Sequence, residues 1–342
     1  MIETSLPIPV QTQPPPVAER AMRHKLVNSF DRDTFRSFFA HRPVRAVWTF
    51  IHVWAGILAA LGVGEWIWSP AAWWHALLIP LPVFYLGTRF NAFGVQVHEA
   101  SHNLLFKSRR LNEVFCNFFG AYWILNDVES YRKVHQLHHT DLHQDTDPDR
   151  NLYDLPRDGD RVLVVRKLCE DFFWITAIGR MASYCSRSRT AGRRNHTLGK
   201  LTAQAALFWA SVSVFGPGSG ALFYFVFWLI PLFSVFPLIV RLRIVAEHFI
   251  EHPVAASGKP FVSRSTCASF IEGYLFGCDM QYHFEHHLLP GVPHPQLKRL
   301  HAALVEREFF EELPFAEDYL NRGYVAFWLR LLAGVRQGAG YA

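Results

Sequence analysis

Charged residues are scarce in this chain of 342 residues. Asp, Glu, Lys and Arg together make up 18% of the sequence, whereas hydrophobic residues make up 50%. A soluble domain usually carries about a quarter charged residues. The apolar residues are also gathered into long runs, so the composition disfavours a soluble protein and favours one that is embedded in a membrane.

Cysteine motifs are lacking as well. The sequence has no Cys-x-x-Cys pair, and its five cysteines are scattered as Cys116, Cys169, Cys185, Cys267 and Cys278. This distribution argues against a zinc site made of thiolates and against a disulfide framework. We therefore expect isolated, half-buried thiols without a chemical role.

A signal peptide and a nucleic-acid-binding stripe are also missing. No apolar core follows Met1, and Pro14-Pro15-Pro16 interrupts the first stretch, so residues 1–20 are predicted to be a disordered tail. The net charge is +5, but the basic residues do not form one stripe, so no nucleic-acid partner is expected.

Four apolar runs are present, and about 20 such residues are needed to cross a bilayer as a helix. The predicted crossings are residues 47–68, 71–97, 201–215 and 221–240. We expect an all-α integral membrane fold that forms a single domain over residues 21–342. Its four transmembrane helices would support a cytosolic helical cap that holds a di-metal site.

Basic residues set the expected orientation of these crossings. The segments 20–45, 107–200 and 241–307 carry most of the Lys and Arg, whereas the links 64–71 and 216–220 carry none. The positive-inside rule then places both termini and the central segment in the cytosol. Arg241 is expected to mark the end of the fourth crossing.

Three shorter segments look amphipathic. Residues 21–45 can form a helix on the membrane surface, with Phe30, Phe35, Phe38 and Phe39 as its apolar side. Val114–Leu125 and Phe172–Tyr184 are too short to span and are predicted to be interfacial or re-entrant helices.

Histidine is concentrated in a few clusters of regular spacing. The sequence reads His98-Glu-Ala-Ser-His102, then His135-Gln-Leu-His138-His139, and later His283-Phe-Glu-His286-His287. Residues four apart on a helix share a face. The first cluster therefore brings two imidazoles together, and the spacing of the other two predicts three imidazoles on one face of each. A further pair, His248 and His252, is also four residues apart.

These histidines exceed the needs of one metal ion. The eight residues of the three clusters and one of the later pair make nine nitrogens, whereas a tetrahedral zinc takes four ligands. Nine nitrogens suit two adjacent metal ions, and nitrogen-rich coordination of redox-active metals points to iron and O₂ chemistry. Isolated histidines are expected to be structural or solvated, namely His24, His52, His75, His196 and His301.

The three histidine boxes, with Leu288-Leu289-Pro290 after the last one, resemble those of the integral-membrane fatty acid desaturase superfamily. The resemblance runs over about residues 45–305, and the order and spacing of the boxes are specific. It implies a non-haem di-iron centre that uses O₂ as co-substrate and two external electrons. Its metal ligands would be His98, His102, His135, His138, His139, His248, His283, His286 and His287.

The resemblance also implies partners and a location. The substrate would be a lipid or acyl group, and the chain would sit in a membrane, which we expect to be the bacterial inner membrane. The sequence has no His-Pro-Gly-Gly haem motif and no cysteine cluster, so a separate electron donor of the ferredoxin or cytochrome b5 type is expected. His252 is a weaker ligand candidate, and Ile244 departs from the Asn that some members carry at this position.

Acidic residues beside the boxes are candidates to orient the histidines. Ligating histidines usually donate their other N–H to a carboxylate or carbonyl. The candidates are Asp145, Asp147, Glu99, Glu247 and Glu285. For the two aspartates, a solvated acidic turn before Pro148 is an equally good interpretation.

Three alternatives remain at this point. His98-Glu99-x-x-His102 matches the motif of a membrane zinc protease, in which Glu99 would be the general base. A haem electron carrier would need paired histidines within the crossings, where only His52 and His75 are found. Within the desaturase superfamily, a lipid hydroxylase or carotenoid ketolase is the main competitor of a desaturase.

Overall fold

The computed structural model describes residues 24–68, 73–155, 161–179, 196–249, 263–310 and 320–333. The predicted tail at residues 1–20 and the candidate ligand His252 lie outside these ranges. The described chain is mostly helical, and its only strands form one short parallel pair, β1 (Ser265–Thr266) with β2 (Leu320–Asn321). The prediction of an all-α fold is confirmed.

The helices follow one another along the chain with short connections. Those before the third apolar run are α2 (Arg32–Phe38), α3 (Pro43–Trp68), η1 (Trp73–Leu78), α4 (Pro80–Ser101), α5 (Arg109–Phe119), η2 (Ala121–Ile124), α6 (Val128–Asp141), α7 (Arg150–Tyr153) and α8 (Arg161–Phe172). The later ones are α10 (Thr197–Phe215), α11 (Pro217–Tyr224), η3 (Phe225–Leu229), η4 (Pro231–Val235), α12 (Phe236–His248), α14 (Phe270–Glu272), η5 (Gly273–Gly277), α15 (His283–Leu288), α16 (His294–Val305) and α17 (Tyr324–Ala333).

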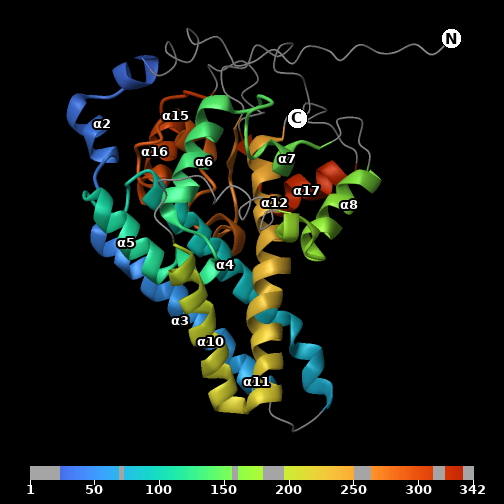
Figure 1. The fold of residues 1–342 in the computed structure, drawn as a ribbon. Coiled ribbons are helices and arrows are strands. Elements are labelled where there is room, and N and C mark those ends of the chain that lie inside the picture. The colour runs from blue at the N-terminus through green and yellow to red at the C-terminus, as the bar shows by residue number, and fades with distance from the viewer. Residues whose placement is uncertain are drawn as a thin grey trace, which may run out of the picture.

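Four of these helical stretches are long and apolar enough to cross a membrane, as predicted. They cover Arg32–Trp68, Trp73–Ser101, Thr197–Phe215 and Pro217–His248. Their far ends meet at the α10–α11 turn, and the shorter helices α6, α7, α15, α16 and α17 gather at the opposite end (Figure 1). We call this group of shorter helices the cap.

The fourth apolar helix is longer than the sequence suggested. It continues past Arg241 and Arg243 as far as His248, because both guanidinium groups are paired within the protein. Arg241 forms an ion pair with Asp171 at the end of α8, and Arg243 Nε donates to Glu247 Oε1 at 2.9 Å. A paired charge can be buried at far lower cost than an isolated one, so these arginines do not end the helix.

Two π-helical turns carry the proline-containing part of this helix. The segments η3 and η4 have the wider π geometry, and η4 begins at Pro231. Proline lacks an N–H and clashes with the preceding turn of an α-helix. The π turns absorb this defect without breaking the helix, which is a common origin of such bulges.

Helix α4 lies at the centre of the molecule. It contacts α3, α5, α6, α12 and the π turn η4, and its residues Phe90 and Phe93 are fully buried. Gly87 allows the closest of these contacts, because a Cβ atom at this position would collide with the side chain of Val235. The helix is thereby held firmly where its last turn presents His98.

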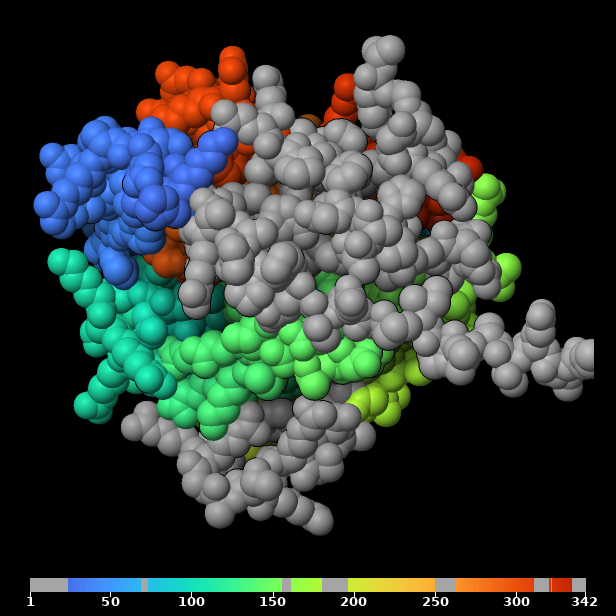
Figure 2. All heavy atoms as spheres, turned by 90° about the horizontal axis from the view of Figure 1, so that it is seen from above, coloured from blue at the N-terminus to red at the C-terminus, as the bar shows by residue number. Residues whose placement is uncertain are grey.

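The N-terminal phenylalanines do not form a free membrane-facing surface. Phe30 and Phe38 are buried together with Leu297 and Leu300 of α16, and the blue N-terminal segment lies beside the orange C-terminal part in Figure 2. Arg299 also lies over the ring of Phe38. The apolar side of this segment is therefore used to cover the cap.

The two predicted interfacial segments fare differently. The first begins earlier than expected, as α5, and ends in the short turn η2. Val114 and Phe118 on α5 are exposed, so an outward apolar side is present. The second was predicted over Phe172–Tyr184, but α8 ends at Phe172 and residues 180–184 lie outside the described ranges.

Candidate metal centre

Four helices deliver the clustered histidines to one place in the cap. His98 lies in the last turn of α4 and His102 directly follows that helix, His248 is the last residue of α12, and the two other boxes lie on α6 and α15. Helix α6 starts at this point because the Asp127 side chain accepts a hydrogen bond from Ser130 N at 2.7 Å. Such an N-cap contributes roughly 0.5–2 kcal/mol to helix stability.

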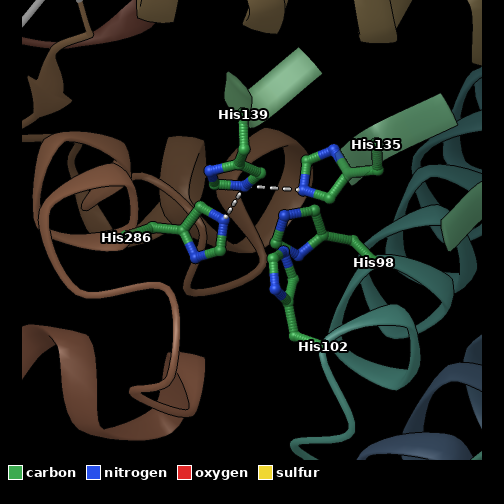
Figure 3. A group of neighbouring side chains, drawn as sticks. All are labelled: His98, His102, His135, His139 and His286. Carbon is green, nitrogen blue, oxygen red and sulfur yellow. Dashed lines mark hydrogen bonds between the residues drawn. The ribbon is translucent and has the colours of Figure 1, made fainter. Parts of the chain in front are cut away.

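All nine predicted histidines are brought together, and they form two groups. One group, shown in Figure 3, contains His98, His102, His135, His139 and His286. The other contains His138, His248, His283 and His287. Within each group the potential ligand nitrogens lie within 4.8 Å of one another. The isolated histidines at positions 24, 52, 75, 196 and 301 belong to neither group.

The prediction that each later box presents three imidazoles on one face is wrong. On α6, His135 and His139 join the first group, whereas His138 joins the second. On α15 the division is reversed, since His283 and His287 join the second group and only His286 joins the first. Adjacent helical residues point about 100° apart, so neighbouring histidines serve different groups.

The nitrogen atoms approach closely. His139 Nε2 lies 3.0 Å from His135 Nε2 and also 3.0 Å from His286 Nε2. Adjacent ligands of one metal ion at bond lengths of about 2.0–2.1 Å are separated by roughly 3 Å when they meet near a right angle. A single ring proton cannot satisfy both contacts of His139, so the convergence fits a shared cation better than a hydrogen-bond network.

Unpaired buried nitrogens strengthen this fit. Within the described residues, His98 is buried with neither ring nitrogen hydrogen-bonded, and His102 Nε2 is also without a hydrogen-bond partner. A buried polar atom without a partner costs roughly 1–3 kcal/mol. Ligation of a metal ion by these nitrogens would remove that cost.

The histidines of the cap are kept neutral. Burial, reinforced by the neighbouring His98, lowers the pKa of His102 to about 3. Burial and the other histidines likewise hold the pKa values of His135, His283, His286 and His287 well below the usual range. A neutral imidazole has a free lone pair, which is the form that binds metals.

Comparison with known proteins agrees with this geometry. The family model described as fatty acid desaturase matches residues 71–319, which is most of the chain and includes all nine histidines. The chain belongs to the fatty acid desaturase family. It is also similar to dihydrorhizobitoxine desaturase of Bradyrhizobium elkanii, with 25% identity over 237 residues, 65% of this chain and 65% of that protein. That match therefore spans slightly less than two thirds of the relative.

One acidic residue of this desaturase-family chain contacts a clustered histidine directly. His138 Nδ1 lies 3.0 Å from Asp147 Oδ1, and the Asp147 side chain is fully buried. The same carboxylate accepts from Tyr153 Oη and from the backbone N–H of Asp149. Burial alone would lower the pKa of His138, but Asp147 and Asp149 outweigh it and raise that pKa. The arrangement orients the ring and leaves Nε2 for a metal.

The other four acidic candidates differ from this arrangement. Three of them have other main partners: Glu99 accepts from the backbone N–H of His294 at 3.0 Å, Glu247 accepts from Arg243, and Glu285 contacts Ser265 and His301. They lie behind the histidine boxes and fix the surrounding loops. Asp145 is 87% exposed and pairs with Arg150, so its prediction as an orienting residue is wrong.

Several supporting residues were not found from the sequence. His294 packs its ring against Glu99, with Nδ1 3.2 Å from Oε2, and His301 is bonded to Glu285 despite its isolated position in the sequence. Arg132 on α6 donates to the backbone oxygens of Ser101 and Ala100 at the end of α4. The only sequence signal for Arg132 was its place one turn before His135.

Proposed function

We propose that this protein is an O₂-dependent membrane oxidoreductase that uses two non-haem iron ions to desaturate an acyl chain or a related lipid. The observation that carries the proposal is the pair of histidine groups at one end of four apolar helices. Membership of the fatty acid desaturase family supports the reaction class, and the donor set supports the metal.

Iron suits this donor set better than zinc. Five nitrogens in one group and four in the other exceed what two tetrahedral zinc sites with open positions would need. Imidazole ligands are compatible with iron, which also has the redox chemistry that a desaturation requires. The nine histidines named above would hold the two ions.

The overall reaction is a four-electron reduction of O₂. Two electrons and two hydrogens come from the substrate, two electrons come from a separate donor together with two protons, and two waters are formed. Bound iron would supply the O₂ activation that removal of hydrogen from an unactivated carbon requires. We propose a ferredoxin or a cytochrome b5-type protein as the donor.

The residues of this chain would contribute orientation and a water-poor environment. Burial keeps the imidazoles neutral, and Asp147 fixes the ring of His138. The cap encloses the centre, since His135, His138, His283 and His286 are all almost completely buried. Such an enclosure protects other groups from a strong oxidant and limits attack to the carbon pair that is positioned there.

A lipophilic substrate is supported by the position of the histidines at the ends of the apolar helices α4 and α12. The basic segments support a cytosolic location of the cap, and we propose the bacterial inner membrane as its site. The printed name of the B. elkanii relative gives dihydrorhizobitoxine as its substrate, so membership of the family alone does not fix the substrate.

The geometry disfavours a zinc protease. The carboxylate of Glu99, which would be the general base of that enzyme, is bound by the backbone and ring of His294. It is therefore not free to activate a water molecule. The second histidine group would also have no role in a protease.

Metal analysis and lipid profiling test the proposal. The detergent-purified protein should contain nearly two irons per chain, and cells that express it should gain a new double bond in a lipid. His138→Ala should lose the activity and lower the iron content, while the protein still inserts into the membrane. A new hydroxyl group would indicate a hydroxylase instead, and full activity of His138→Ala would contradict the di-iron centre.

A further inference from the structure

A second polar pocket lies at the start of the first apolar helix, outside the histidine groups. Its volume is about 710 Å³. It is lined mainly by His41, Arg42, Arg45, Trp48, Pro295 and Gln296. These residues come from the beginning of α3 and the beginning of α16, two segments that are distant in sequence.

The pocket has a positive electrostatic character. Arg42 and Arg45 are both exposed at its wall, and only Arg45 has an acidic partner there, Asp279 at 2.9 Å. The helices α3 and α16 both begin at the pocket, and the N-terminal end of a helix carries a partial positive charge. Two arginines and two helix ends together favour an anion with several oxygen atoms, such as a phosphate.

The pocket also lies at the membrane boundary. Trp48 is 64% exposed and Val44 is 83% exposed, and both belong to the start of the first apolar helix. Tryptophan is enriched at the level of lipid head groups. An anion in this pocket would therefore be at head-group depth, with an apolar helix surface directly below it.

Short connections link the pocket to the first histidine box. His41 Nε2 lies 3.1 Å from the backbone oxygen of Asn103, which follows His102. On the opposite wall, His294 precedes Pro295 and is bonded to Glu99, which follows His98. The pocket is thus adjacent to the candidate metal centre without sharing any of its nine histidines.

We propose that this pocket binds the phosphate of a phospholipid head group, whose acyl chains would extend along α3. A phosphate could also come from a soluble acyl carrier, but the exposed Trp48 and Val44 favour a lipid. The proposal goes beyond the proposed function, because binding of a phosphate requires neither iron nor turnover.

Lipid binding to the full-length, detergent-purified protein tests this proposal by native mass spectrometry. The probe is dioctanoyl phosphatidylglycerol, and dioctanoyl glycerol is the matched lipid without a phosphate. Arg42→Gln should weaken phosphatidylglycerol binding roughly tenfold, the effect expected for one hydrogen bond to a charged group. Arg36→Gln, an exposed arginine of α2 outside the pocket lining, should not change it.

Asp279→Asn separates an anion site from a purely structural role of Arg45. It removes the ion pair but leaves the positive charge of Arg45. If the arginine binds phosphate, this variant should bind phosphatidylglycerol about two- to fivefold more tightly, because a competing carboxylate of a surface ion pair is lost. If the arginine serves only the ion pair, Asp279→Asn should bind no more tightly than the parent protein.

Three results would overturn the proposal. Arg42→Gln could bind the phospholipid as well as the parent protein does, or dioctanoyl glycerol could bind equally well. Coenzyme A could also displace the phospholipid at a lower concentration than the lipid itself needs for binding, which would assign the pocket to a soluble carrier. All of these measurements can be made on iron-free protein, so their failure differs from a failure of the di-iron proposal.

Discussion

Replacement of Asp147 by asparagine is the sharpest test of how the cap holds metal. The side chain is fully buried and is bonded to His138, Tyr153 and the N–H of Asp149. Asparagine keeps the shape but removes the negative charge that orients His138. Loss of such an outer partner typically weakens metal binding 10- to 100-fold, or about 1.4–2.8 kcal/mol.

Because His138 belongs to only one of the two histidine groups, Asp147→Asn should weaken one metal position and spare the other. Iron content measured during titration with a chelator should therefore fall in two separate steps, with the first iron lost at a 10- to 100-fold lower chelator concentration than in the parent protein. Asp145→Asn, in the same loop but exposed, is the matched control and should match the parent. A variant that keeps both irons with unchanged affinity would refute the reasoning.

Further predictions concern the third box and the helix packing. His286→Ala and His287→Ala should each abolish activity, yet each should retain about one iron per chain in elemental analysis, because the two residues belong to different groups; equal loss of both irons in both variants would contradict the division. Gly87→Ala should destabilise the protein by about 1–3 kcal/mol, since the new methyl group meets Val235, and a thermal melt in detergent would show it. Gly62→Ala, which meets nothing within 4 Å, should leave the melting temperature nearly unchanged.

Much of the candidate site could be predicted because its signals are local. The spacing of His98 and His102, and of His135 and His139, places both pairs on one helical face whatever the rest of the chain does. The apolar runs likewise require helices when they lie in a bilayer. These constraints need no knowledge of tertiary contacts.

The division of the boxes could not be predicted, because it depends on how α6 and α15 face each other. Spacing within one helix does not say whether His138 points to the same metal position as its neighbour. The roles of His294 and His301 were also hidden, since their partners Glu99 and Glu285 come from other helices. The extent of the fourth helix was misjudged for the same reason, as the partner of Arg241 is 70 residues away.

The π turns η3 and η4 determine the rotational phase of everything that follows them. A π turn holds one more residue than an α turn, and each residue of a helix advances its direction by about 100°. Deletion of one residue in the segment 225–235 would restore a regular α-helix, yet it would turn His248 away from its group. The fourth helix therefore has a reading frame in space, and this stretch should tolerate substitutions far better than insertions or deletions.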